Sequence, residues 1–464
     1  MSRRLVVLTA VLSLVLGGLG LAPVAAQEDC DFVDEVVIGV IAPLTGDIPK
    51  VGQSTQEAAT MAVDEINAAC GLEIDGENYE VVIIIEDNEA KAESSVAAAT
   101  RLIVDEEVVA IIGPQASKQA VPTGQVANDR ETPMISPWST NPDTTFDRPW
   151  VFRAAFLDPF QGPVVAGFVQ EEYGATTAAV LYDIASDYPK GLAENFRDAF
   201  EASGGDIVAF ESFTTGDADF SSQLTNIIAA NPDVIFTPQY YNEVPLIVQQ
   251  ARELGYTGPI VGSDSWGTPD LLDLCGDACE GLFFSTHYAP DIATDVAQAF
   301  ITAYEERYGA KPDDVAALTY DAFQMLFIAI ESAQSLERAD IRDALAGIEL
   351  FEGVTGVMSF DEQGDPVKCA VIIQIKDGAF TYYDSACPAG FPPEEMGEEG
   401  GEMGMLDGEA LVAERCTVCH NADRINAAEK DRAGWEATVD RMIGNGAQLN
   451  DEERAAVIDY LASQ

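Results

Sequence analysis

The residues with the clearest chemistry lie near the C-terminus, where Cys416 and Cys419 are separated by two residues and followed directly by His420. A c-type haem attaches through this Cys-x-x-Cys-His pattern: both thiols form thioethers to the haem edge, and the imidazole ligates the iron. A redox dithiol or a zinc site is the alternative. Zinc needs four ligands, and the only other histidine of the chain is the distant His287. The pattern therefore predicts one covalent haem c.

A second axial ligand is expected on the helical face that Trp435, Val439 and Met442 share, where Met442 either ligates the iron or packs in the core. The segment resembles small c-type cytochromes, which follow Cys-x-x-Cys-His with a tryptophan-containing helix, a glycine-rich turn and a closing helix. The corresponding residues are Trp435, Arg441-Met442, Gly444 to Gly446 and Tyr460-Leu461. The resemblance implies an all-α cytochrome domain over residues 409–464 that transfers electrons. A five-coordinate haem would instead permit ligand sensing.

A second polar group follows two strand-like runs in the first third of the chain. Ser117 comes after Ile111-Ile112-Gly113-Pro114, and Ser139 and Thr140 come after Ile135-Ser136-Pro137. Hydroxyls and free backbone N–H groups at a helix start suit an anion such as a carboxylate. Hydroxyls beside proline and glycine also commonly cap helices and turns. The pattern thus indicates an anion site or a set of caps.

The elements that must position these residues alternate from about residue 35 to residue 351. Segments with apolar residues at helical spacing, such as Gln56 to Ala69 and Ala90 to Val104, separate continuous apolar runs. These runs are Val36 to Ile41, Val81 to Ile85, Val108 to Ile112, Ala178 to Tyr182, Asp233 to Thr237, Pro259 to Gly262 and Gly281 to Ser285. The alternation predicts α/β structure with parallel sheets covered by helices. The length favours two doubly wound lobes around a cleft.

Several segments between about Val36 and Tyr383 resemble the leucine/isoleucine/valine-binding family of type I periplasmic binding proteins. They include Pro43-Leu44-Thr45-Gly46, Ala62 to Asn67, Ile111 to Pro114, Phe152-Arg153, Asp187-Tyr188, Gln250 to Gly255, Ala278 to Gly281 and Phe360 to Asp365. The resemblance implies a hinged, two-lobed domain over residues 27–389. Lobe 1 would hold about 35–153 and 286–354, and lobe 2 about 154–285 and 355–389. Such a protein binds a solute for an ABC transporter and is not an enzyme.

The same resemblance implies roles for particular residues around the cleft. Ser117 and Thr140 would hold a ligand carboxylate, while the main chain at Trp138 and the side chain of Asp264 would take its ammonium. Tyr188 and Tyr240 would close the cleft from lobe 2, and Trp138 and Tyr320 would line the side-chain pocket. The family more often has glutamate at position 264 and a small residue at position 138. The tryptophan implies a smaller ligand, or one that stacks on an indole.

The N-terminus has the three parts of a secretory signal peptide over residues 1–26. Arg3 and Arg4 precede the apolar stretch Leu5 to Leu21, and Val24-Ala25-Ala26 is a small-residue cleavage site. An uncleaved membrane anchor is the alternative. Export to the periplasm or the cell exterior is therefore expected. Residues 390–408, rich in glycine, glutamate and methionine, are predicted to link the two domains.

Cysteine pairing follows from export, because disulfides persist in oxidising compartments. Cys369 and Cys387 flank two strand-like runs at equal distances from Gly378, so a hairpin would place them opposite each other. Cys275 and Cys279 would close a short loop, and Cys30 and Cys70 remain as the third pair. Free thiols or a different pairing are the alternatives.

The chain carries 79 acidic and 24 basic residues, for a formal charge of −55. Such a surface repels phosphate groups, which argues against a nucleic-acid partner. The expected partners are an amino-acid-like solute, a membrane permease and, for the haem segment, a redox protein. A sensor, or an electron-transfer protein that uses the large domain for docking, is the alternative function.

Overall fold

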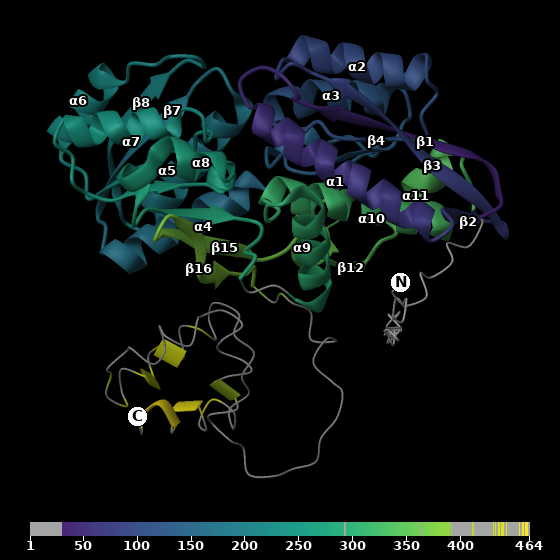
Figure 1. Cartoon of the computed structure of the whole chain (residues 1–464). Coiled ribbons are helices and arrows are strands. Elements are labelled where there is room, and N and C mark those ends of the chain that lie inside the picture. The colour runs from purple at the N-terminus through teal and green to yellow at the C-terminus, as the bar shows by residue number, and fades with distance from the viewer. Residues whose placement is uncertain are drawn as a thin grey trace, which may run out of the picture.

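The computed structural model describes residues 30–389 except 292, 293 and 362, then residue 391 and single residues or short runs between 411 and 462. The predicted signal peptide, the linker over 392–408 and the haem-attachment residues Cys416, Cys419 and His420 lie outside the described residues. Figure 1 shows two α/β lobes side by side.

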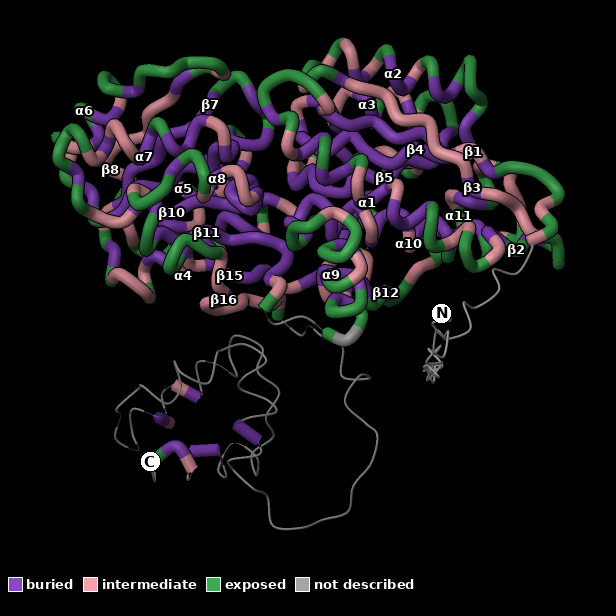
Figure 2. The backbone as a smooth tube through the Cα atoms, viewed as in Figure 1, coloured by how far each residue is buried: buried purple, intermediate pink, exposed green. Residues whose placement is uncertain are grey.

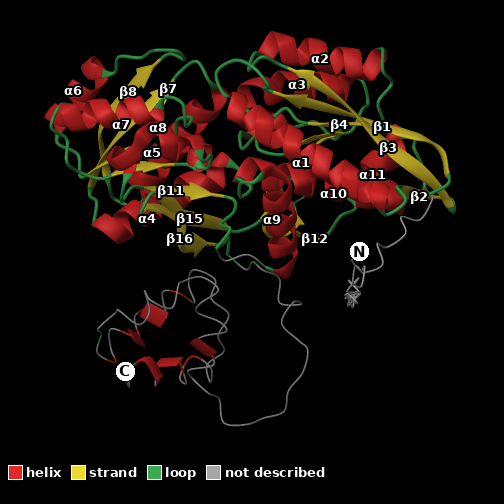
Figure 3. Ribbon diagram, viewed as in Figure 1, coloured by secondary structure: helices red, strands yellow, loops and turns green. Residues whose placement is uncertain are grey.

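The first lobe is built on a six-stranded sheet in the order β2-β3-β1-β4-β5-β6. The strands are β1 (Phe32–Ala42), β2 (Leu72–Ile74), β3 (Glu77–Asp87), β4 (Ala110–Ile112), β5 (Met134–Ser136) and β6 (Val151–Arg153). The helices between them are α1 (Pro49–Ala68), α2 (Ala92–Val104) and α3 (Ser117–Asp129). The strands pair in parallel except β2, which runs antiparallel to β3. Helices cover this sheet, and its central strands are buried (Figures 2 and 3).

The second lobe is built on a seven-stranded sheet in the order β16-β15-β11-β10-β9-β7-β8. Its strands are β7 (Thr177–Asp183), β8 (Asp206–Phe213), β9 (Val234–Phe236), β10 (Ile260–Gly262), β11 (Phe283–Thr286), β15 (Ala370–Lys376) and β16 (Ala379–Ala386). Its helices are α4 (Asp158–Tyr173), α5 (Asp187–Ala202), α6 (Ser221–Ala230), α7 (Val244–Glu253) and α8 (Asp270–Cys275). The seven predicted apolar runs coincide with the parallel strands β1, β3, β4, β7, β9, β10 and β11, whereas the parallel strands β5, β6 and β8 were not among them.

After β11 the chain returns to the first lobe. There α9 (Asp295–Tyr308) and α10 (Asp314–Ala333) pack against α1, and α11 (Arg338–Ala346) packs on α10. A small antiparallel sheet follows, made of β12 (Leu350–Gly353), β13 (Gly356–Phe360) and β14 (Pro366–Val367). The chain thus crosses between the lobes three times: after β6, after β11 and before β15. The predicted lobe boundary at residue 354 falls inside the β12–β13 hairpin, and the last crossing comes later.

The edges of the sheets are antiparallel: the β15–β16 hairpin around Gly378 was predicted, whereas the antiparallel strand β2 and the antiparallel pairing of β15 with β11 were not. Each of these edge hairpins has a short connection, whereas a parallel pair needs a long crossover. Asp75-Gly76 and Asp377-Gly378 make two of the turns, and all four residues adopt positive φ angles, which suit tight hairpin turns.

The structure joins the cysteines in the three pairs that the spacing predicts: Cys30–Cys70, Cys275–Cys279 and Cys369–Cys387. The last of these bridges the open end of the β15–β16 hairpin. Among the described residues one helix, α10, is long and apolar enough to cross a membrane, but 72% of its most apolar window is buried. It is a core helix of the first lobe.

In the C-terminal segment, the described apolar residues gather in one cluster. It contains Leu411, Val412, Trp435, Val439, Val457, Ile458 and Leu461. Met442 is helical and half-buried. The all-α cytochrome domain stays a prediction, because the haem-attachment residues are not described.

Candidate functional site

A small pocket of about 150 Å³ lies between the two lobes. The first lobe contributes residues at the start of α3 and in the loop after β5; the second contributes residues after β7, β9 and β10. The lining residues are Ala116, Ser117, Trp138, Tyr188, Tyr240 and Asp264. All follow the carboxyl ends of parallel strands, where ligands bind in open α/β sheets. Five of the eight residues predicted for the cleft therefore line one pocket.

The first-lobe wall presents hydroxyls at a helix start. Ser117 is the first residue of α3, and the preceding Ala116 offers no side-chain cap to the N–H groups of the first turn. The Ser117 hydroxyl lies 2.8 Å from that of Ser139, which lies 2.8 Å from that of Thr144. The Asn141 N–H also donates to Ser117, at 3.4 Å. This wall suits an anion, because the hydrogen-bond donors and the positive end of the helix dipole lie together at the start of α3.

A buried cation holds the loop that carries these hydroxyls. The Arg153 guanidinium, fully buried, donates to the carbonyl oxygen of Ser139 at 2.8 Å and to that of Asn141 at 3.0 Å. Its Nε lies 2.6 Å from the Asp365 carboxylate, and the Thr145 hydroxyl donates to the same carboxylate at 2.8 Å. The Arg153–Asp365 ion pair therefore holds the loop over residues 139–145 in place from the side away from the pocket.

Thr140, predicted to bind a carboxylate, is buried behind the pocket beside Asp158. The Asp158 N–H donates to the Thr140 carbonyl at 2.9 Å. Burial, reinforced by the charge of Asp264, raises the pKa of the Asp158 carboxyl to about 8, and the Thr140 hydroxyl acts in the opposite direction. Asp158 is thus a largely neutral carboxyl at pH 7, and sequence reasoning missed it.

The second-lobe wall centres on the carboxylate of Asp264. Its Oδ1 accepts from the Tyr188 hydroxyl at 2.7 Å and from the Gln161 amide at 2.8 Å. Nε2 of His287 lies 3.7 Å from Oδ2. Burial lowers the pKa of His287, so the imidazole is neutral at pH 7. Neutral donors therefore hold this carboxylate, with no cation at hydrogen-bonding distance.

Aromatic rings complete the pocket. The Trp138 and Tyr240 ring centroids are 6.0 Å apart, and those of Tyr188 and Tyr240 are 5.5 Å apart. The Trp138 indole N–H donates to Oδ2 of Asp314 at 3.0 Å, and the Thr286 hydroxyl donates to the same oxygen at 3.1 Å. The tryptophan is therefore tied to the start of α10 and, through it, to the end of β11.

Tyr320 does not lie in the pocket, so the expectation that it lines the side-chain site does not hold. Its hydroxyl donates to Glu65 on α1 at 2.6 Å, and its ring packs 4.7 Å from that of Phe300 on α9. The face of α10 that carries Tyr320 packs on α1 and α9, whereas Asp314, at the start of the same helix, contacts Trp138.

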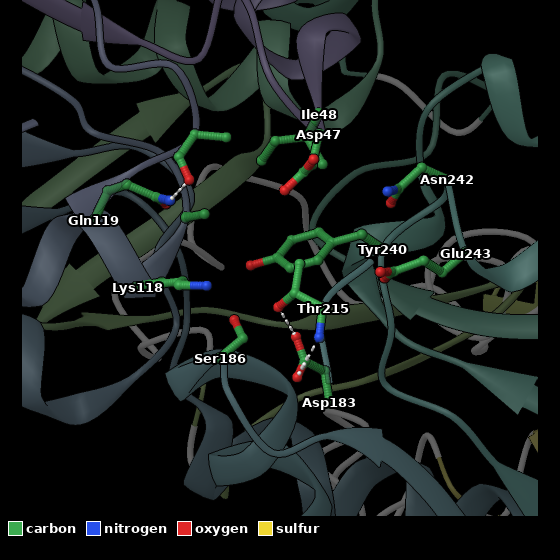
Figure 4. Close-up of a pocket in the computed structure, with 12 residues that line it drawn as sticks. Asp47, Ile48, Lys118, Gln119, Asp183, Ser186, Thr215, Tyr240, Asn242 and Glu243 are labelled. Atoms are coloured by element: carbon green, nitrogen blue, oxygen red, sulfur yellow. Dashed lines mark hydrogen bonds between the residues drawn. The ribbon is translucent and has the colours of Figure 1, made fainter. Parts of the chain in front are cut away.

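A wider pocket of about 380 Å³ opens beside the inner one and shares Ala116 and Tyr240 with it. Figure 4 shows Lys118 of α3 pointing into this space, with Asp183 and Thr215 of the second lobe beyond it. Because the two pockets share walls, we interpret the wider one as the mouth of the cleft.

Besides the Thr286–Asp314 bond, two further hydrogen bonds join the lobes beside the pockets. The Asn141 side-chain amide donates to the Asp187 carbonyl at 3.1 Å. The Lys50 N–H, in the first turn of α1, donates to the Tyr241 hydroxyl at 3.2 Å. The N-cap residue of α1, Ile48, provides no side-chain cap, so a tyrosine of the opposite lobe supplies one.

Sequence reasoning missed four polar residues around the pocket: Asp158, Gln161, His287 and Asp314. His287 follows the apolar run Gly281 to Ser285, so the strand-end rule that selects Ser117 also selects it. Asp158 and Gln161 begin α4, but no local pattern places them near Asp264. Asp314 is 176 residues away from Trp138, with which it forms a hydrogen bond, so no local sequence pattern predicts this contact.

The chain is similar to known families and proteins. The family model of periplasmic binding proteins matches residues 35–379. The model of the haem-binding domain of the quinohemoprotein amine dehydrogenase A, alpha subunit, matches residues 406–464. The leucine-, isoleucine-, valine-, threonine- and alanine-binding protein of Pseudomonas aeruginosa is 28% identical over 353 residues, covering 76% of this chain and 90% of that protein.

Solved structures agree with the large domain. A leucine-binding protein from Thermotoga maritima is 37% identical, with a TM-score of 0.73, covering 76% of this chain and 99% of that one. A branched-chain amino-acid transporter substrate-binding protein from Streptococcus pneumoniae, in complex with isoleucine, is 32% identical with a TM-score of 0.71, covering 76% of this chain and 100% of that one. Both similarities leave the C-terminal segment uncovered.

Proposed function

Since the chain belongs to the periplasmic binding protein family, we propose that it is the exported solute-binding component of a branched-chain amino-acid type ABC transporter. Its ligand is an amino acid or a related small zwitterion or amide, bound as the lobes close. The observation that carries this proposal is the inner pocket, where a hydroxyl at a helix start faces a buried carboxylate from the other lobe. Such opposed groups are complementary to a zwitterion.

The pocket residues then take distinct roles. Ser117 and the free N–H groups of α3, backed by Ser139 and Thr140, hold the ligand carboxylate. Asp264 and the main chain at Trp138 take the ammonium. Tyr188 and Tyr240 close the cleft from the second lobe, and closure removes the charged groups from water, which strengthens their attraction.

Calorimetric titration of the full mature chain with a panel of amino acids, amides and small carboxylates tests this proposal. We expect one zwitterion to bind and to raise the melting temperature by mass action. Ser117→Ala should weaken binding of that ligand, whereas Ser94→Ala, at a half-buried serine of α2 that does not line the pocket, should not. Absence of binding by every zwitterion would contradict the proposal.

The C-terminal segment supports a second proposal, a covalent haem c for electron transfer. Its match to a haem-binding family and the Cys-x-x-Cys-His pattern support it. Cys416 and Cys419 would attach the haem, His420 would ligate the iron, and Met442 would supply the second axial ligand. The described residues of this segment include a half-buried helical methionine, Met442, and an apolar cluster of the kind that covers a haem face. The bound haem would supply one-electron chemistry.

Mass spectrometry of the protein, expressed with a cytochrome c maturation system, tests the attachment. We expect covalent haem in the wild type and none in the double variant Cys416→Ser/Cys419→Ser. Met442→Ala should change the haem spectrum if this methionine ligates the iron. A redox-silent haem in voltammetry would contradict electron transfer and favour the alternative, a sensor that reports occupancy of the cleft.

These proposals define the partners and the location. The protein acts outside the cytoplasm, with a membrane permease as its transport partner and a redox protein as the partner of the haem. Its acidic surface favours a basic partner and disfavours nucleic acid.

A further inference from the structure

The apolar part of the inner pocket is almost entirely aromatic. The Tyr240 ring lies beside those of both Trp138 and Tyr188, and Ala116 is the one aliphatic residue that lines the pocket. The three rings are nearly inaccessible to solvent, with exposures of 3%, 3% and 9%. Ring faces carry partial negative charge, so they attract a cation, and the attraction is stronger where water is excluded.

The tryptophan is held in this arrangement by contacts outside the pocket. Asp314 accepts from the Trp138 indole N–H at 3.0 Å and from Thr286 at 3.1 Å. Gly267 of the second lobe lies close enough that a Cβ there would be 2.7 Å from Oδ1 of Asp314. The Asp314 side chain therefore has little freedom, and the indole position is set by the fold.

Asp264 adds a negative charge to the ring cluster, and one of its two carboxylate oxygens is already engaged by neighbouring side chains. Its Oδ1 already accepts from Tyr188 and Gln161. The Tyr188 hydroxyl also lies 2.6 Å from the Ser263 hydroxyl and 3.1 Å from that of Ser265, so this side of the carboxylate is densely bonded. A cation that needs charge but few hydrogen-bond acceptors is complementary to such a site.

A methylated ammonium has these properties, because its charge is spread over C–H groups and it needs few N–H acceptors or none. Rings around an ammonium, with a carboxylate nearby, are a recurrent means of recognising quaternary ammonium. The pocket is small and lined by only six residues, so it favours a compact ligand.

Resting on the proposed solute-binding function, we propose that the ligand is a compact zwitterion with an N-methylated ammonium, a betaine. The methylated ammonium lies among the rings of Trp138, Tyr188 and Tyr240 beside Asp264. The carboxylate lies at the start of α3 with Ser117. Trp138 is then the residue that selects this class over aliphatic amino acids.

Calorimetric titration of the full mature chain with glycine betaine, leucine and tetramethylammonium chloride tests the proposal. We expect glycine betaine to bind at least about tenfold more tightly than leucine, because the free energy of one desolvated cation–π contact corresponds to about that factor. Tetramethylammonium, which has no carboxylate for Ser117, should bind more weakly than glycine betaine but measurably.

Three variants separate the ring effect from simple packing. Trp138→Leu should lower the affinity for glycine betaine about tenfold or more. Trp138→Phe should lower it less, because phenylalanine retains an aromatic face, although a weaker one. Trp150→Leu is the matched control: its ring lies outside the cleft, 4.8 Å from the Arg342 guanidinium carbon, and its loss should not affect affinity. Circular dichroism of each ligand-free variant checks that it folds.

The outcomes distinguish this inference from the function on which it rests. Leucine binding more tightly than glycine betaine would overturn the betaine proposal and leave solute binding intact. Equal affinities of Trp138→Leu and wild type for glycine betaine would also overturn it, even if both bind. Absence of binding by glycine betaine, leucine and every other zwitterion would overturn both proposals.

Discussion

The two walls of the cleft are built in opposite ways. The first-lobe wall presents neutral hydroxyls and a helix start, and a buried cation, Arg153, supports it from behind. The second-lobe wall presents a negative charge, Asp264, which neutral donors support. The first-lobe wall therefore suits an anion and the second-lobe wall a cation. The residues that line the pocket include no cation that would neutralise Asp264.

This difference indicates where each wall is vulnerable. The first wall depends on an ion pair that never touches the pocket, so its loss should act through stability. The second wall presents its charge directly to the pocket, so its loss should act through affinity. Substitutions on the two walls should therefore separate losses of stability from losses of affinity.

Replacing the buried cation should have the largest effect. Arg153→Met leaves the Asp365 carboxylate buried without its partner and frees the loop over residues 139–145. We expect the free energy of unfolding to fall by about 3–5 kcal/mol. Arg101→Met, which breaks the more exposed pair with Glu86, should cost about 1 kcal/mol or less. Denaturant unfolding measures both, and equal losses would contradict the assigned role of Arg153.

Removing the pocket charge should act on binding instead. Asp264→Asn should weaken a zwitterionic ligand by about 2 kcal/mol or more, roughly thirtyfold, because the ammonium loses its countercharge in a desolvated site. The same substitution at Asp206, an exposed residue of β8, should leave affinity unchanged. Titration calorimetry measures the difference. Unchanged affinity in Asp264→Asn would place the ammonium site elsewhere.

The carboxyl between the walls should make stability depend on pH. The pKa of Asp158 is raised to about 8, so the folded protein retains a proton that the unfolded chain releases near pH 4. In the ligand-free protein, the protonated Asp158 carboxyl lowers the stability of the fold least below about pH 4, where the unfolded chain is protonated as well. The free energy of unfolding then falls as the pH rises towards 8, because the unfolded chain releases this proton and the folded protein does not. Asp158→Asn should remove that loss and stabilise the protein by about 1–3 kcal/mol at pH 9.

Thermal unfolding of wild type and Asp158→Asn between pH 5 and pH 9 measures this effect. The two melting temperatures should be close at pH 5 and diverge as pH rises. Parallel curves would show that Asp158 does not titrate in this range.

The bond between the lobes should have the smallest effect. Tyr241→Phe removes the hydroxyl that caps α1 from the opposite lobe and keeps the ring. We expect ligand affinity to fall about twofold to fivefold, the value of one hydrogen bond of about 0.5–1 kcal/mol. In Tyr256→Phe, the lost hydroxyl bonds Pro259 within the second lobe, so stability should fall without a change in affinity. Equal affinity changes in the two variants would contradict a role in closure.

Much of the fold follows from local pattern. A strand buried on both faces must be continuously apolar, so runs such as Val36 to Ile41 and Ala178 to Tyr182 identify the parallel strands without tertiary information. The hairpin symmetry of Cys369 and Cys387 about Gly378 likewise identifies a disulfide. Edge strands carry a weaker pattern, and the return of the chain through β12–β14 was misplaced for that reason.

From the sequence alone, the ends of the parallel strands indicate Ser117, Ser139 and Thr140, because such strands bring their carboxyl ends to one edge of a sheet. The family resemblance adds Trp138, Tyr188, Tyr240 and Asp264. The tertiary structure alone decided how helices face the cleft. Tyr320 packs against α1 and α9, whereas Asp314, six residues earlier on α10, holds Trp138. It also brought Asp158, Gln161 and His287 to Asp264. Such contacts depend on how lobes and helices pack over long sequence separations, which no local spacing encodes.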